Sequence, residues 1–267
     1  MLPPPGPNRA ALITGASSGI GAEIARVLSD RGHHVVLVAR RTEQLTDLAE
    51  QLRRPSSVVG ADLSQPAQRA QLPERVAALG LEVDILVNNA GLSTMGPVAA
   101  ADPDAELTVI EVDVAAVVDL CTRFVAGMVG RRRGAVLNVA SVAAFGPLPG
   151  QAVYGAAKAF VLSYTRALGE ELKSSGITAT ALCPGPVHTG FGEAAGISTE
   201  EAEAALPKPL WVSPEDVARA AVDGLAAGDP VVVPGRLNRA ATAVYHLTPR
   251  RLLLPLLARN HPGLKQK

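Results

Sequence analysis

The sequence predicts an α/β protein built on a doubly wound parallel sheet, a three-layer Rossmann fold with about seven strands. Short apolar, β-branched runs alternate with longer segments that show helical periodicity. The runs have little apolar/polar alternation, which is typical of strands covered on both faces. Repeated strand–helix alternation favours right-handed crossovers. No Pro/Gly/Ser-rich linker divides the 267 residues, so we expect one domain over residues 1–267.

The apolar runs place the strands in chain order. We expect them at Ala10–Thr14, His34–Val38, Ser57–Val59, Ile85–Asn88, Ala135–Ala140, Ile177–Cys183 and Val231–Val233. Three further segments fall outside this alternation. The proline-rich stretch 1–8 is expected to be a loose, flexible leader. A long insertion, 188–212, follows the sixth strand, and a C-terminal extension, 236–267, is longer than sheet closure requires. An insertion beyond a strand's carboxyl end is where this fold places a substrate lid.

The composition excludes several classes of function. The 25 basic and 25 acidic residues cancel, and aromatic residues make up only 3%, so we expect no nucleic-acid binding. No apolar signal region or membrane-spanning run is present, which favours a cytoplasmic location. The two cysteines, Cys121 and Cys183, are expected as buried free thiols rather than a disulfide, and the five histidines have no metal-ligand spacing.

A glycine-rich turn follows the first strand directly. It reads Thr14-Gly15-Ala16-Ser17-Ser18-Gly19-Ile20-Gly21 and opens a helical segment. Glycines at 15, 19 and 21 allow a tight turn, a close approach to a pyrophosphate and close helix–strand packing, and the helix N-terminus offers free amides to phosphates. We therefore expect Gly15, Ser17, Ser18, Gly19, Ile20 and Gly21 to bind a dinucleotide.

The end of the second strand bears on which dinucleotide binds. A carboxylate there would hold the adenosine ribose hydroxyls and repel a 2′-phosphate. Here Arg40 and Arg41 stand instead, and two guanidiniums can pair with a 2′-phosphate. The alternative is two solvated arginines. We predict NADP(H) as the cofactor, with Asp62 and Leu63 at its adenine end, although Asp62 would look the same as a plain turn residue.

A tyrosine and a lysine four residues apart open a later helical segment. Tyr154 and Lys158 would share one helix face, with Cβ atoms about 5–6 Å apart. A phenol has an ordinary pKa near 10, and a nearby cation favours the phenolate, so Tyr154 can act as a general acid and base. Ser141, just past the fifth strand, could hold the substrate oxygen.

These motifs occur together with the turn Asn88-Asn89-Ala90-Gly91 and with Cys183-Pro184-Gly185-Pro186. In this combination the chain resembles the short-chain dehydrogenase/reductase family over about residues 10–235, with every landmark in the family's order. The resemblance implies a catalytic core of Ser141, Tyr154 and Lys158. It also implies a cofactor cleft lined by Tyr154, Lys158, Asn89, Ala90, Gly91, Pro184, Gly185, Val187 and Thr189, and a homodimer or homotetramer.

One position departs from the family pattern. The family usually carries an asparagine on the long helix after the fourth strand, and the matching residue here is Asp113. Its backbone carbonyl can still hold a water against the catalytic lysine, and its charge would stabilise Lys158 as a cation. A surface or helix-bend aspartate without a catalytic role is the alternative.

Apolar residues in the presumed lid, with few charges beyond its glutamates, indicate an apolar carbonyl or secondary-alcohol substrate; these are Phe191, Ile197, Leu206, Leu210 and Trp211. The main alternative to an oxidoreductase is a protein that binds the nucleotide only as a sensor or scaffold. A third possibility is an enzyme that performs epimerisation or dehydration with bound cofactor, but such relatives usually have a larger C-terminal domain.

The C-terminal extension mixes leucines with arginines, including Leu252, Leu253, Leu256, Leu257, Arg250 and Arg259. It is expected either to pack on the substrate entrance or a neighbouring subunit, or to touch a membrane surface.

Overall fold

A parallel sheet forms the centre of the computed structural model, which describes residues 2–196, 198–248, 251, 254–255, 258 and 262–264. Among these residues seven strands pair in parallel in the order β3-β2-β1-β4-β5-β6-β7. The order reverses direction between β1 and β4, which is the topological switch point where doubly wound folds bind ligands. The predicted fold class is confirmed.

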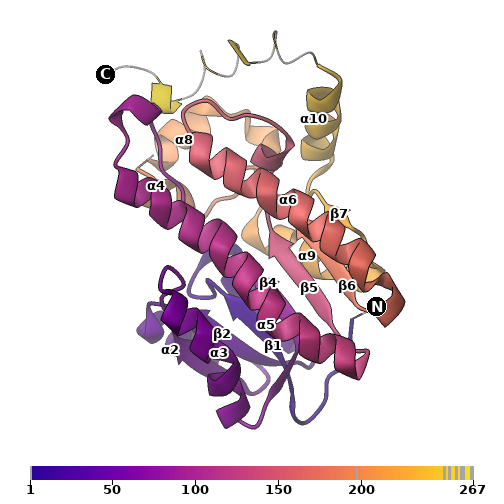
Figure 1. Cartoon of the computed structure of the whole chain (residues 1–267). Helices are drawn as coiled ribbons and strands as arrows, with labels where there is room; N and C mark the ends of the chain where they lie inside the picture. The colour runs from indigo at the N-terminus through magenta and orange to yellow at the C-terminus, as the bar shows by residue number, and fades with distance from the viewer. Residues whose placement is uncertain are drawn as a thin grey trace.

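The elements alternate along the chain as predicted (Figure 1). The strands are β1 Arg9–Thr14, β2 His34–Ala39, β3 Ser56–Gly60, β4 Glu82–Asn88, β5 Ala135–Val139, β6 Thr178–Leu182 and β7 Val231–Val232. The α-helices are α1 Gly19–Asp30, α2 Thr42–Gln51, α3 Pro66–Ala78, α4 Pro103–Ile110, α5 Ala116–Arg131, α6 Ala152–Leu172, α7 Phe191–Ala194, α8 Thr199–Ala205, α9 Pro214–Ala227 and α10 Arg236–Leu247. Short helical turns are η1 Val98–Ala100, the π-helical η2 Glu111–Ala115, η3 Val142–Phe145, η4 Lys173–Ser175, η5 Lys208–Leu210 and η6 Pro262–Leu264.

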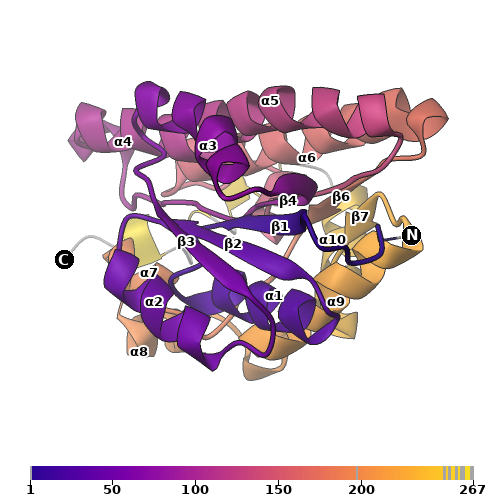
Figure 2. The same ribbon diagram turned by 90° about the horizontal axis from the view of Figure 1, so that it is seen from below.

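Helices cover both faces of the sheet. Figure 2 shows α3, α4, α5 and α6 on one side and α1, α2 and α9 on the other. Each face has its own apolar core, in which residues such as Leu86 and Leu120 pack on one side and Ile13 and Leu28 on the other. Both faces of each central strand are therefore buried, which explains why the strands read as continuous apolar runs.

The predicted strands all form, and most of their bounds differ by one residue. The larger difference is at β4, which begins at Glu82 rather than Ile85. Glu82 pairs in register with Arg9 on β1, and its amide donates a hydrogen bond to the carbonyl of Asn8. The apolar run misses this start because the charged Glu82 and Asp84 interrupt it.

Residues 2–8 were expected to be a loose leader and instead lie against the domain. Leu2 packs on the core beside α1 and α9, and Pro3 is buried. The carbonyl of Pro4 accepts a hydrogen bond from Arg133, which follows α5. The prolines keep this segment extended, as expected, but the contacts with the domain hold it in place.

The C-terminal extension returns to the rim of the sheet's carboxyl edge. Helix α10 packs against η3 and η5, and η6 contacts α8. A Cβ added to Gly263 in η6 would lie 2.5 Å from Met95 and 3.3 Å from the carbonyl of Gly150, so this turn (yellow in Figure 1) is close to both loops. Of the residues discussed above, Ile197, Arg250, Leu252, Leu253, Leu256, Leu257 and Arg259 lie outside the described part of the chain. Within that part, no helix has the length and apolar character needed to cross a membrane.

Candidate active site

The predicted site residues meet at the carboxyl edge of the sheet, around the switch point. The glycine-rich loop follows β1, the Asn89–Gly91 turn follows β4, Ser141 follows β5 and the Pro184–Thr189 loop follows β6. The first turns of α6 bring Tyr154 and Lys158 to the same edge. Parallel topology therefore gathers segments that are far apart in the sequence.

The glycine-rich loop has the backbone shape that a phosphate cradle needs. Gly15 and Gly19 have φ values of +63° and +57°, a region that residues with a Cβ rarely adopt. A Cβ on Gly15 would lie 2.8 Å from the Cα of Ala90, and one on Gly21 would lie 2.3 Å from the side-chain amide of Asn89. The loop, the β4 turn and the start of α1 pack this closely only because the side chains are absent, and the amides at the α1 N-terminus remain available for phosphates.

A threonine at the end of β1 holds the loop against the β4 turn. The Thr14 hydroxyl accepts hydrogen bonds from the amides of Asn89 (2.9 Å) and Ala90 (3.1 Å) and donates to the carbonyl of Val87 (3.3 Å). The Asn89 side-chain amide donates in turn to the carbonyls of Thr14 (3.0 Å) and Gly15 (3.1 Å). The glycine-rich loop and the turn after β4 are thus one hydrogen-bonded unit.

Arg41 lies beside the glycine-rich loop. Its guanidinium donates hydrogen bonds to the hydroxyls of Ser17 (3.1 Å) and Ser18 (3.2 Å). No carboxylate in the described part of the chain forms an ion pair with Arg41, so its charge is available to an anion. Arg40 is exposed. Of the two arginines, the structure brings Arg41 to the loop.

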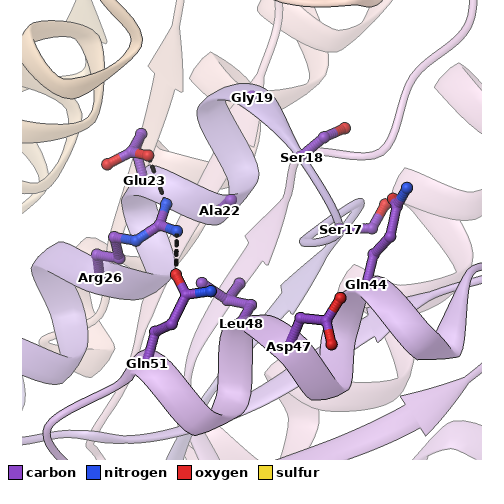
Figure 3. Close-up of a pocket in the computed structure, with 10 residues that line it drawn as sticks. All are labelled: Ser17, Ser18, Gly19, Ala22, Glu23, Arg26, Gln44, Asp47, Leu48 and Gln51. Atoms are coloured by element: carbon purple, nitrogen blue, oxygen red, sulfur yellow. Dashed lines mark hydrogen bonds and ion pairs between the residues drawn. The ribbon is translucent and has the colours of Figure 1, made fainter.

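A hollow lies beside this loop, between α1 and α2 (Figure 3). It shares Ser17, Ser18 and Gly19 with the cradle, but its other charged groups are Glu23, Arg26 and Asp47. Arg26 is already engaged, since it pairs with Glu23 at 2.5 Å and donates to Gln51 at 3.0 Å. An anion bound to the serine hydroxyls would therefore meet the free charge of Arg41 rather than that of Arg26.

The turn after β3, expected at the adenine end, is fixed by its own contacts. Asp62 Oδ1 accepts hydrogen bonds from the amide (3.0 Å) and hydroxyl (2.8 Å) of Ser64. The carbonyl of Leu63 accepts from the buried Arg69 at 2.6 Å. Asp62 therefore acts as a turn residue through one oxygen, while its second oxygen has no hydrogen bond to another described residue.

Ser141, Tyr154 and Lys158 lie together next to the cleft. The Lys158 ammonium is 5.7 Å from the centroid of the Tyr154 ring, and Ser141 caps η3 by accepting from the amide of Ala143 at 3.1 Å. Burial raises the pKa of Tyr154 above its ordinary value, and Lys158 and a hydrogen bond with Ser141 offset only part of that rise. The nearby cation therefore favours the phenolate, as expected, but burial outweighs it, and the net raised pKa favours the protonated phenol at neutral pH.

Asp113 is neither on the surface nor at a free helix bend. It sits in the π-helical turn η2 between α4 and α5, with 0% of its side chain exposed, and its Oδ2 lies 2.9 Å from the Lys158 Nζ. Its Oδ1 accepts a hydrogen bond from the amide of Leu92 at 2.7 Å. The extra residue in a π-helical turn shifts the helix register, and such turns often occur at functional sites.

The loop after β6 faces the glycine-rich loop and leads into the presumed lid. Thr189 lies against Gly19, where an added Cβ would be 3.0 Å from its methyl group, and Val187 pairs with Val212 at the far end of the segment. Phe191, on α7, packs on Tyr154 with ring centroids 5.8 Å apart. The lid segment therefore has one aromatic side chain directly against the tyrosine.

Two residues at the carboxyl edge of the sheet were not predicted as site residues from the sequence. Thr14 could have been found, because it is a polar residue at the end of an otherwise apolar strand. Asn238 on α10 carried no such signal: it is 4% exposed and donates to the carbonyls of Leu210 (3.0 Å) and Pro234 (3.1 Å). A Cβ on Gly185 would lie 2.5 Å from its side chain, so α10 reaches the loop after β6.

A parallel doubly wound sheet with a glycine cradle at its switch point and a Ser–Tyr–Lys cluster beside it defines an oxidoreductase that binds a nicotinamide dinucleotide. The comparisons with known proteins agree. The family described as short chain dehydrogenase matches residues 9–199, and the chain belongs to that family.

Relatives and solved structures extend this likeness over most of the chain. Nodulation protein G of Rhizobium sp. (strain N33) is 36% identical over 231 residues, covering 86% of this chain and 94% of that protein. The granaticin polyketide synthase putative ketoacyl reductase 1 of Streptomyces violaceoruber is 40% identical over 190 residues, covering 68% of this chain and 69% of that protein. A short-chain dehydrogenase from Sphingobium yanoikuyae in complex with NADPH superposes with a TM-score of 0.79 at 32% identity, covering 92% of this chain and 95% of that one. A 3-ketoacyl-(acyl-carrier-protein) reductase from Brucella melitensis complexed with NADH gives 0.76 at 28% identity, with 85% and 96% covered.

Proposed function

We propose that this oxidoreductase interconverts an apolar ketone or aldehyde and its alcohol with NADP(H), using Tyr154 as the general acid and base. The observation that carries the proposal is the placement of Tyr154, Ser141 and Lys158 beside the glycine cradle. The residues present fit a dinucleotide because the glycines let the loop pack against the turn after β4, where a Cβ would collide, and leave the amides at the α1 N-terminus for its phosphates. The bound nicotinamide would supply or accept the hydride.

In the direction of reduction, Ser141 and Tyr154 hold the carbonyl oxygen of the substrate. As negative charge develops on that oxygen, Tyr154 donates its hydroxyl proton and is left as a phenolate beside the Lys158 ammonium. In the direction of oxidation, the phenolate removes the proton from the alcohol. The raised pKa of Tyr154, caused mainly by burial, supports the proton-donor form at neutral pH.

The choice of NADP(H) over NAD(H) rests on Arg41. An unpaired guanidinium that touches the hydroxyls of Ser17 and Ser18 can form charge-assisted hydrogen bonds with a 2′-phosphate. The NADPH in the Sphingobium structure agrees with this preference, whereas the Brucella structure was solved with NADH. Arg40, Asp62, Leu63, Asn89, Ala90, Gly91, Pro184, Gly185, Val187 and Thr189 are proposed to line the rest of the cofactor site.

The apolar character of the substrate rests on the lid. Phe191 is 38% exposed and lies on the ring of Tyr154, so an apolar group of the substrate would cover it on binding. The test is a panel of apolar ketones and aldehydes, with NADPH consumption followed by absorbance and NADPH binding followed by fluorescence. Consumption with apolar ketones supports the proposal; tight NADPH binding with no consumption across the panel would favour a nucleotide-binding sensor instead.

A further inference from the structure

The Asp113–Lys158 pair is an ion pair enclosed by the protein. Asp113 is 0% and Lys158 4% exposed, and their nearest charged atoms are 2.9 Å apart. Each partner also has a backbone contact that suits its charge: the Leu92 amide donates to Asp113, and Lys158 donates to the carbonyl of Val139 at 3.1 Å. These contacts stabilise a carboxylate and an ammonium in place.

The third side of the pair is closed by a glycine. A Cβ on Gly91 would lie 3.1 Å from Asp113 Oδ2 and 3.2 Å from Lys158 Nζ. The turn that lines the cofactor cleft therefore lies directly on the ion pair. Because water is excluded, the two charges act on their surroundings with little screening.

A neutral amide at position 113 would remove the charge that opposes the Lys158 ammonium near Tyr154. With a carboxylate there, the negative charge of Asp113 offsets part of the effect of Lys158 on the phenol. The groups that act on Tyr154 are Lys158 on its own helix, Asp113 on η2, Ser141 after β5 and the Cys183 thiol after β6. Lys158 favours the phenolate and Asp113 opposes it, so position 113 decides how much of the lysine's charge Tyr154 feels.

On the basis of the proposed function, we infer that Asp113 is a positioning residue. Its carboxylate offsets part of the Lys158 charge and, together with burial, helps to keep Tyr154 a proton donor. This favours carbonyl reduction across the neutral range and confines alcohol oxidation to alkaline pH. In reduction the phenol proton goes to the substrate oxygen while the hydride from NADPH goes to the carbonyl carbon. The protein then regains one proton from solvent, so charge and electrons balance.

The pKa directions at Tyr154 and Lys158 agree with this geometry, whereas at Asp113 burial raises the pKa and the nearby Lys158 and the Leu92 amide oppose that rise. Burial raises the pKa of Tyr154, Lys158 lowers it and Asp113 raises it again. Burial lowers the pKa of Lys158, but Asp113 and Tyr154 carry it above its ordinary value, so the ammonium persists. A phenol with a raised pKa is a competent acid at pH 7 and supplies its conjugate base only at higher pH.

The test compares Asp113→Asn with the wild-type protein and with Asp223→Asn, which removes an exposed carboxylate on α9 that pairs with Arg31. Tyrosinate absorbance is titrated against pH in each protein, and the Tyr154 signal is isolated by subtracting the matching Tyr154→Phe variant. We expect the Tyr154 midpoint to fall by at least about one pH unit in Asp113→Asn, equivalent to a tenfold change in ionisation, and to stay unchanged in Asp223→Asn. An unchanged or higher midpoint in Asp113→Asn would overturn the inference.

The pH profile of kcat/KM provides the kinetic counterpart. kcat/KM for reduction should fall at alkaline pH, and kcat/KM for oxidation should fall at acid pH. In Asp113→Asn both of these transitions should move to lower pH, by the same amount as the Tyr154 titration midpoint. If that variant does not fold, the wild-type titration still decides, because a Tyr154 midpoint below about pH 9 would contradict a phenol whose ordinary pKa near 10 is raised. A shifted titration without turnover on any carbonyl would support this inference while refuting the proposed function.

Discussion

The side-chain amide of Asn238, on the C-terminal helix α10, donates a hydrogen bond of 3.0 Å to the carbonyl of Leu210, in the segment that leads from the lid to α9. The same amide donates to the carbonyl of Pro234, and the side chain packs on Gly185, which is proposed to line the cofactor site. A segment beyond the last strand thus joins the lid to the cofactor loop. The described part of the extension therefore contacts the loops around the proposed site.

Replacing Asn238 with alanine should loosen this junction. The buried carbonyl of Pro234 and the part-buried carbonyl of Leu210 would lose their donor, so we expect the free energy of unfolding to fall by about 1–3 kcal/mol. We also expect KM for the carbonyl substrate to rise more than kcat falls, since the change lies at the lid rather than at Tyr154. Thermal unfolding and steady-state kinetics check this. Thr242→Ala is the control on the same helix, because its hydroxyl donates to the carbonyl of Arg239 within α10. Equal effects in both variants would contradict a role of Asn238 in joining the lid to the loop after β6.

Removing the guanidinium of Arg41 should weaken NADPH more than NADH. The loss of charge-assisted hydrogen bonds to a 2′-phosphate corresponds to about 1.5–3 kcal/mol, or roughly 10- to 100-fold in KM for NADPH. KM for NADH should change little, because NADH lacks that phosphate. Both constants are measured for Arg41→Ala and for Arg26→Ala, whose side chain is engaged with Glu23 and Gln51. A matching loss for NADH, or a larger loss in Arg26→Ala, would contradict the assignment.

A methyl group at position 91 should disturb the buried ion pair. The added Cβ would press on Asp113 Oδ2 and Lys158 Nζ at 3.1 and 3.2 Å, so one of them must move. For Gly91→Ala we expect kcat to fall by about tenfold or more, since small misplacements at a reacting site are costly.

The matched control for that substitution is Gly130→Ala. Gly130 lies within α5 with open space where its Cβ would stand, and alanine favours a helix by about 1 kcal/mol over glycine. We expect this variant to keep full activity and to unfold at a slightly higher temperature. Full activity in Gly91→Ala as well would show that the pair tolerates the added methyl group.

Much of the fold could be predicted from residue patterns. Strands such as β1, which are buried on both faces, read as continuous apolar runs. The start of β4 was missed because Glu82 and Asp84 are held by arginines from distant segments, which no local pattern reveals. Position 113 was singled out, but its contact with Leu92 and its complete burial depend on the π-helical turn. Asn238 was missed because its partner Leu210 is 28 residues away and the bond is with a backbone carbonyl, which any residue could offer.

Tyr154→Phe is the most direct test of Tyr154 as the proton donor in carbonyl reduction. This variant keeps the ring that packs on Phe191 at 5.8 Å and removes only the hydroxyl, so NADPH binding and thermal stability should stay close to wild type. NADPH-dependent reduction of an apolar ketone that the wild-type protein turns over is then measured in both proteins at the same pH. We predict a loss of kcat by about 10²-fold or more, the scale of general acid catalysis. Turnover retained at the wild-type rate would contradict the role of Tyr154 as the proton donor.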